Sequence, residues 1–122
     1  PGVNFITPNE SSLQLGYISQ PRGKTIKAHY HKPTTRTLYY TNEVLILKQG
    51  KLRVDFYDNK KEYLESYILK AGDVMLLESG GHGFVVLEDI EMVEVKQGPY
   101  VEDKDKDRFE GIKAKDVILK YE

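Results

Sequence analysis

The stretch EVLILKQGKLRVDFYDNKKEYLESYIL, residues 43–69, decides the fold class of this chain. Apolar and polar side chains alternate along it with a period of two residues, and Val, Ile, Leu, Tyr and Phe fill most apolar positions. This period is typical of β-strands with one buried face. Gly50 lies between two such runs, which predicts a tight hairpin, and YDNKKEY, residues 57–63, predicts a second turn.

The same pattern extends from this stretch in both directions, and long amphipathic helix patterns are missing. Short strands are predicted over residues 13–19, 25–31, 43–49, 52–58, 63–69, 73–78, 83–88 and 90–96. LKAGDV, residues 69–74, predicts a turn, and residues 101–110 alternate in charge as a solvated loop does. Residues 113–122 have weak helical character and fit a final strand equally well. Eight strands at such spacing favour an all-β sandwich or closed barrel.

Composition limits the function classes. The 122 residues are predicted to form one domain, residues 1–122, and 18 basic against 19 acidic residues leave a net charge of −1. That balance gives no reason to expect a nucleic acid or a membrane surface as partner. The absence of cysteine excludes disulfides, thiolate zinc sites and cysteine nucleophiles. Without an apolar run of about 20 residues or a signal-peptide pattern, we expect a cytoplasmic protein.

Two of the three histidines lie one residue apart in KAHYHKP, residues 27–33. On the predicted strand, His29 and His31 point to the same face with Cα atoms about 6.5–7 Å apart, so both imidazoles can bind one ion. The third, His82, opens a later strand and can reach the same end of a barrel. The alternative is that all three are ordinary surface or turn histidines, because the residues flanking His29 make its face the more polar one.

Glu43 adds a carboxylate to this set. By alternation it shares the inward face of its strand with Leu45 and Leu47. A carboxylate on an apolar face needs a partner, because burying an unpaired charge is costly, and a bound cation would supply one.

The spacing of these residues resembles the two motifs of the cupins. The first motif is matched by Gly23, His29, His31, Glu43 and Gly50, and the second by Gly72, Gly80 and His82. The resemblance covers about residues 16–98 and leaves residues 99–122 as a C-terminal extension. It implies a jelly-roll type double-stranded β-helix barrel that binds one divalent metal through four ligands, which here are His29, His31, Glu43 and His82.

The loop between His31 and Glu43 is longer than the cupin motif has. It adds Arg36, Tyr39 and Tyr40 near the predicted mouth of the barrel. There an Arg side chain can bind a carboxylate or phosphate, and a Tyr side chain can stack on a ring or provide its hydroxyl for a hydrogen bond. Two further candidate ligand contacts lie on the histidine faces of their strands, Lys27 and Phe84. The alternative is an ordinary surface loop.

The ligand set does not select among Fe, Mn, Ni, Co, Cu and Zn. A further resemblance, to small stand-alone cupins associated with bacterial polysaccharide pathways, implies modification of a carbohydrate or nucleotide sugar. The second possibility is oxygenation of a small organic acid or ring. An enzyme, either a metal-dependent isomerase or an oxygenase, is therefore expected. The alternatives are a non-catalytic binding module and a metal-free sugar isomerase or epimerase that uses His and Tyr. Small cupins commonly pair through sheet edges, so we expect a homodimer.

Overall fold

The computed structural model describes residues 2–101 and 106–120. It divides into two compact units, Pro1–Tyr39 and Tyr40–Glu122, and each is described here by itself. The single domain over residues 1–122, with its motif-bearing core at residues 16–98, stays a prediction. Part of the predicted solvated loop, residues 102–105, lies outside the described residues.

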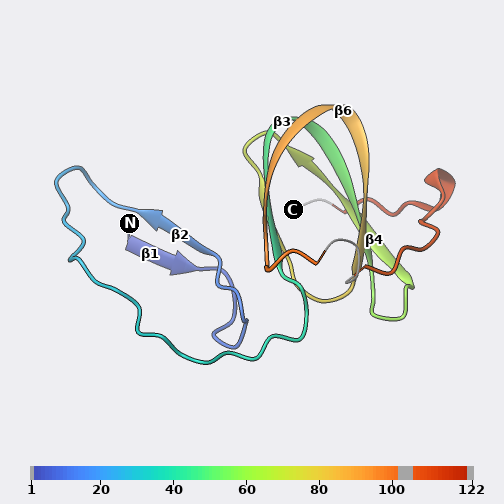
Figure 1. The fold of residues 1–122 in the computed structure, drawn as a ribbon. Coiled ribbons are helices and arrows are strands. Elements are labelled where there is room, and N and C mark those ends of the chain that lie inside the picture. The colour runs from blue at the N-terminus through green and yellow to red at the C-terminus, as the bar shows by residue number, and fades with distance from the viewer. Residues whose placement is uncertain (1, 102–105, 121–122) are drawn as a thin grey trace. The chain divides into compact units, whose positions relative to one another are not determined.

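The first unit contains a small antiparallel pair, β1 (Gly2–Phe5) and β2 (Gly16–Ser19) (Figure 1). β2 confirms the second half of the strand predicted over residues 13–19, whereas β1 was not predicted. The strand predicted over residues 25–31 is wrong, because the described backbone between residues 20 and 42 forms no strand. Alternation is a local property of the sequence, but a strand also needs a hydrogen-bonded neighbour, and this exposed segment has none in its own unit.

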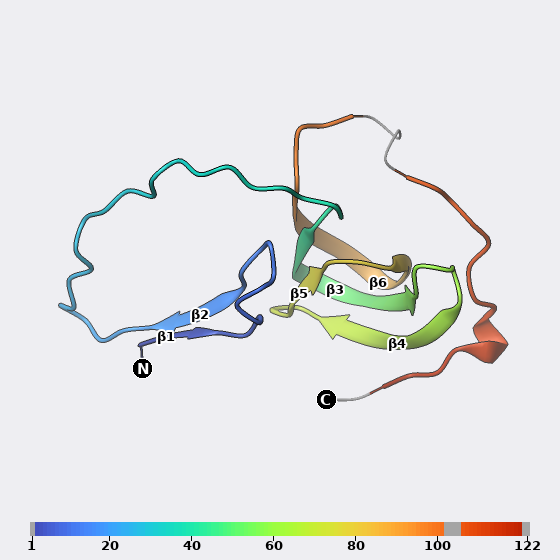
Figure 2. The same ribbon diagram turned by 90° about the horizontal axis from the view of Figure 1, so that it is seen from below.

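The second unit is an antiparallel sheet built around one long central strand. β3 (Glu43–Tyr57) pairs along its whole length with β6 (Gly81–Lys96). On its other side, the later half of β3 pairs with β4 (Tyr63–Lys70) and the earlier half with β5 (Val74–Leu77). Figures 1 and 2 show β3 and β6 arching together, with β4 and β5 against different halves of β3. The predicted all-β class with antiparallel strands is confirmed, and the cupin barrel stays a prediction.

The hairpin predicted at Gly50 is wrong, because β3 continues through this residue. The register between β3 and β6 shifts repeatedly between Leu47 and Leu52, which marks a bulged and bent ladder. Gly50 has φ +87°, and a Cβ added there would collide with the carbonyl oxygen of Asp89. Glycine is therefore needed for a bulge against β6, and the two strands predicted on either side of it are one bent strand.

The bend divides the sheet into two legs. The first leg contains residues 51–57 with β4 and the start of β6, and the second contains residues 43–47 with β5 and the end of β6. The side chains between the legs form the core, and we call this side of the sheet the inner face. The core consists of Leu47, Leu52, Val54 and Leu69, against which Phe56, Met75, Ile90 and Met92 pack.

The C-terminal segment, residues 106–120, packs against the first leg from outside. It contains a short 3₁₀-helix, η1 (Ala114–Asp116), and a parallel bridge between Leu119 and Ser66 of β4. Both alternatives for residues 113–122, helical and extended, are thus present in part. The turns predicted at residues 57–63 and 69–74 are confirmed by backbone hydrogen bonds such as Asp58 N–H to the Glu62 oxygen and Asp73 N–H to the Lys70 oxygen. A search of the described residues finds no helix that is long and apolar enough to span a membrane.

Candidate functional site

Glu43 and His82 meet on the inner face of the second unit. His82 Nε2 lies 3.7 Å from Glu43 Oε2, and the side chains are 29% and 12% exposed. The two residues sit at opposite ends of the β3–β6 ladder, since Glu43 pairs with Lys96 and His82 pairs with Phe56. They meet because the bend at Gly50 brings the ends of the ladder together.

The residues around this pair provide one aromatic wall and two further charges. The Phe84 ring centroid lies 5.4 Å from that of His82. Lys96, directly opposite Glu43 in the ladder, has its Nζ 3.9 Å from Glu94 Oε1 and 5.8 Å from the centre of the Tyr100 ring. Phe84 was a sequence candidate, whereas Glu94 and Lys96 were not. The sequence could have indicated Glu94 and Lys96, because alternation along residues 90–96 places both on the same face as Met92.

His29 and His31 lie together in the first unit, although not on a strand. Their ring centroids are 5.4 Å apart in an edge-to-face arrangement. His29 Nδ1 is 2.8 Å from the Lys27 carbonyl oxygen, which can only accept a hydrogen bond, so Nδ1 carries the proton. In a neutral ring this leaves the Nε2 lone pair for a ligand, the arrangement that metal-binding histidines commonly have.

Two pairs of predicted ligands are thus each assembled within one unit. Within either unit, the described residues form no group of three or more His, Cys, Asp or Glu side chains that could hold a metal ion. Two ligands about 2.0–2.1 Å from a shared ion lie about 3.0–3.4 Å from each other. The 3.7 Å between Glu43 and His82 exceeds this by a few tenths of an ångström.

The remaining candidate contacts are divided between the units. Lys27, Arg36 and Tyr39 are exposed residues of the first unit. Tyr40 belongs to the second, where its hydroxyl lies 3.4 Å from the Asn59 side-chain nitrogen and accepts its hydrogen bond. Contact of these residues with a ligand stays a prediction.

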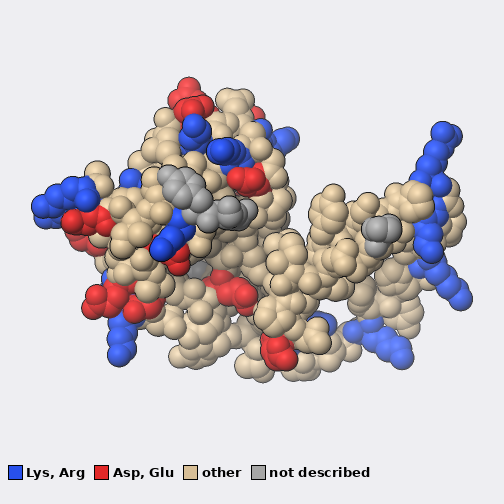
Figure 3. Space-filling model, turned by 180° about the vertical axis from the view of Figure 1, so that it is seen from behind, with Lys and Arg blue, Asp and Glu red and all other residues tan. Residues whose placement is uncertain are grey.

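Charge is distributed unevenly along the chain. Residues 1–39 contain five Lys or Arg and one Glu, a net charge of +4, so the total of −1 leaves −5 for residues 40–122. In the face shown in Figure 3, acidic and basic side chains are interspersed over the second unit.

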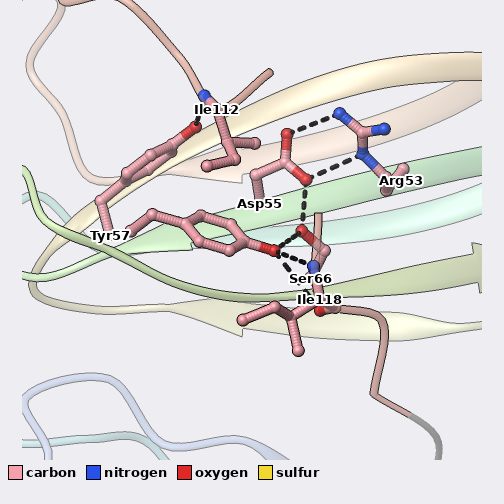
Figure 4. Close-up of polar contacts among 7 residues, drawn as sticks. Arg53, Asp55, Tyr57, Ser66, Ile112 and Ile118 are labelled. Carbon is pink, nitrogen blue, oxygen red and sulfur yellow. Dashed lines mark hydrogen bonds and ion pairs between the residues drawn. The ribbon is translucent and has the colours of Figure 1, made fainter. Parts of the chain in front are cut away.

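A second polar cluster, which the sequence did not indicate, lies on the outer side of the first leg (Figure 4). Arg53 donates two hydrogen bonds to the buried Asp55 carboxylate, at 2.9 and 3.1 Å. Ser66 donates a third at 2.5 Å, and its hydroxyl oxygen accepts from Tyr63 at 2.7 Å. The Tyr63 oxygen in turn accepts the Ile118 N–H at 2.8 Å. Within the described residues no buried side-chain polar atom lacks a hydrogen-bond partner, and the bond from Ile118 to Tyr63 ties this cluster to the C-terminal segment.

Comparisons of the chain with family models, with curated proteins and with solved structures give no match. The relation to cupins is therefore a resemblance between motifs, and arguments about function depend on the side chains themselves.

Proposed function

We propose that this chain binds one divalent transition metal and uses it to act on an oxygen-bearing small molecule. Glu43 and His82 are two of the ligands, and His29 and His31 are the two that the sequence motif adds. The observation that supports the proposal is that Glu43 and His82 lie 3.7 Å apart on the inner face, although they come from opposite ends of the ladder between β3, of 15 residues, and β6, of 16 residues.

The donor atoms suit such a metal. Imidazole nitrogen and carboxylate oxygen together bind Fe, Mn, Ni, Co, Cu or Zn. Both side chains are partly exposed, His82 at 29% and Glu43 at 12%, and the buried Leu45 two residues along β3 anchors the strand that carries Glu43. When bound, the metal would polarise an oxygen of the ligand as a Lewis acid, and a redox-active metal would add oxygen chemistry.

The residues beside the pair indicate how a ligand would be oriented. Phe84 gives a flat apolar surface next to His82, which suits the apolar face of a sugar ring. Lys96 adds a positive charge beside Glu43, which suits a carboxylate or phosphate. A carbohydrate, nucleotide sugar or small organic acid is therefore the proposed substrate class. A cytoplasmic homodimer completes the proposal.

The same geometry favours one other function, a metal-free isomerase or epimerase. A carboxylate beside an imidazole is the arrangement of a general base and its orienting group, and Glu43 would hold His82 in that role. A tyrosine would supply the acid.

Elemental analysis of untagged protein separates the two. We expect about one equivalent of a transition metal per chain, and at least a tenfold lower content in both Glu43→Gln and His82→Gln. Glu91→Gln, an exposed carboxylate on β6, is the matched control and should keep the metal. Absence of metal after reconstitution with Fe, Mn, Ni and Zn would overturn the metal proposal and favour the acid–base alternative. If metal binds without turnover of any sugar or organic acid, while a ligand still raises the melting temperature, the chain is a binding module.

A further inference from the structure

Two glycines flank His82 on β6, in the sequence Gly81-His82-Gly83. His82 points to the inner face, so by alternation the positions before and after it belong to the outer side of the first leg. A glycine brings no side chain to pack and loses more conformational freedom on folding than any other residue, so it weakens the interior of a strand. The backbone that carries His82 therefore depends on groups that pack against it from the outer side.

Two aromatic side chains pack against Gly81 on this outer side. Tyr57 is its cross-strand neighbour in the β3–β6 ladder, and Phe109 comes from the C-terminal segment. A Cβ added at Gly81 would lie 3.0 Å from Phe109 Cζ and 3.3 Å from Tyr57 Cβ, so the two side chains leave little room for another. An aromatic side chain that covers a glycine of the neighbouring strand restores packing that the glycine lacks.

The two rings contact each other and are held by their own neighbours. Their centroids are 4.9 Å apart at an interplanar angle of 89°, the edge-to-face arrangement that aromatic pairs favour. The Tyr57 hydroxyl accepts the Ile112 N–H at 2.8 Å, as Figure 4 shows. Lys61 Nζ lies 5.9 Å from the centre of the Phe109 ring and 2.7 Å from Asp107 Oδ2. These contacts attach the C-terminal segment on either side of Phe109 and so fix its ring.

We propose that Phe109 is a positioning residue for His82. The proposal rests on the proposed function, in which His82 is a metal ligand, and it gives the C-terminal segment a part in that function. A ligand side chain has to be held within about 0.5 Å of its binding geometry, and a strand with glycine on both sides of the ligand does not achieve this alone. Phe109 limits movement of the β6 backbone toward the outer side, and so keeps His82 beside Glu43.

One methyl group added at Gly81 tests this contact with the least disturbance. Gly81→Ala places a Cβ against Phe109, so the ring or the strand must move by a few tenths of an ångström. Gly83→Ala is the matched control, because it adds the same group on the other side of His82, where the nearest atom, Tyr57 Cε1, is 3.9 Å away. Neither glycine has a positive φ, so the backbone accepts alanine at both positions.

The first measurement is the nuclear Overhauser effect between the His82 ring and the Glu43 side chain in metal-free protein. We expect Gly81→Ala and Phe109→Leu to weaken this effect several-fold and Gly83→Ala to keep it. In the Phe109→Leu background, Gly81→Ala should have little further effect, because the ring atom that its Cβ would meet is gone. An effect absent from the wild type, or unchanged in both variants even if urea denaturation finds them less stable, would overturn the proposal.

Zinc affinity is the second measurement. The Zn²⁺ dissociation constant, obtained by isothermal titration calorimetry, should rise about tenfold in Gly81→Ala and in Phe109→Leu and stay unchanged in Gly83→Ala. Equal affinity in the wild type and all three variants would overturn the proposal and leave the proposed function intact. A wild type that binds no metal would overturn the proposed function, and the Overhauser effect in metal-free protein then decides whether Phe109 positions His82.

Discussion

Gly50 shows how one residue determines the geometry of the candidate site. A side chain at this position would collide with the carbonyl of Asp89, and its φ of +87° is strained for any residue with a Cβ. The bulge that glycine permits bends the β3–β6 ladder, and the bend brings Glu43 to His82. A glycine that the sequence suggested for a hairpin is instead the residue that lets a long strand bend.

We predict that Gly50→Ala lowers the free energy of unfolding by roughly 2–4 kcal/mol, because backbone strain and a clash with β6 add together. Gly72→Ala is the control, since Gly72 also has positive φ, at +97°, but nothing lies within 4 Å of its added Cβ. It should cost only about 1–2 kcal/mol. Urea denaturation measures both, and equal losses would contradict the role of the Gly50 contact.

Asp55 depends on its partners in a similar way. Asp55→Asn should lower the free energy of unfolding by roughly 2–4 kcal/mol, because Arg53 loses the charge of its buried partner. Glu88→Gln removes the exposed pair with Lys51 on the same leg and should cost no more than about 0.5 kcal/mol. Urea denaturation again measures both variants. Similar midpoints would show that the Asp55 cluster contributes little to the free energy of unfolding.

At the level of elements, the sequence indicated most strands but not how far they extend. The predicted strands at residues 43–49 and 52–58 are both parts of β3, and those at 83–88 and 90–96 are both parts of β6. Periodicity identifies where alternation is interrupted, but it does not distinguish a turn from a bulge. The difference lies in tertiary structure, since Gly50 faces the backbone of a strand that comes almost 40 residues later.

Besides its backbone hydrogen bonds with Ser66, the C-terminal segment donates two backbone N–H groups to tyrosine hydroxyls. Tyr57 accepts from Ile112 and Tyr63 from Ile118, both at 2.8 Å (Figure 4). We predict that Tyr57→Phe speeds hydrogen exchange at the Ile112 amide about tenfold and Tyr63→Phe does the same at Ile118, because each loses about 1–1.5 kcal/mol of local stability. Each variant is the control for the other. Faster hydrogen exchange at both amides in either variant would mean that the segment opens as a whole and would contradict separate roles for the two hydroxyls.

For the whole molecule, the sequence indicated both residue pairs of the candidate site, but it did not indicate the backbone structure around His29 and His31. Alternation predicted Glu43 on an inward face, and the cupin resemblance grouped it with His82; the structure has the two side chains 3.7 Å apart, while metal binding by them stays a prediction. His29 and His31 are adjacent as predicted, but their segment forms no strand in its unit. The alternation over residues 25–31 indicates that they can form a strand, but it does not indicate which neighbouring strand they would pair with.

The proposal therefore predicts that metal protects the histidine segment. Lys27 and Arg36 are exposed on either side of His29 and His31, and the backbone there has no strand hydrogen bonds, so trypsin should cleave at these sites first. Saturation with Zn²⁺ should slow this cleavage several-fold, because ligation restrains the segment. Cleavage at the same rate by protein shown to contain metal would exclude both histidines as ligands.

A Zn²⁺ titration followed by NMR of the histidine rings shows directly whether the three histidines bind one ion. The chain has only three histidines, so each ring gives a resolved signal. We predict that the His82 signals shift together with those of His29 and His31 and saturate at one equivalent, and that Glu43→Gln weakens binding at least tenfold. His82 signals that stay unchanged while Zn²⁺ binds elsewhere would contradict this prediction.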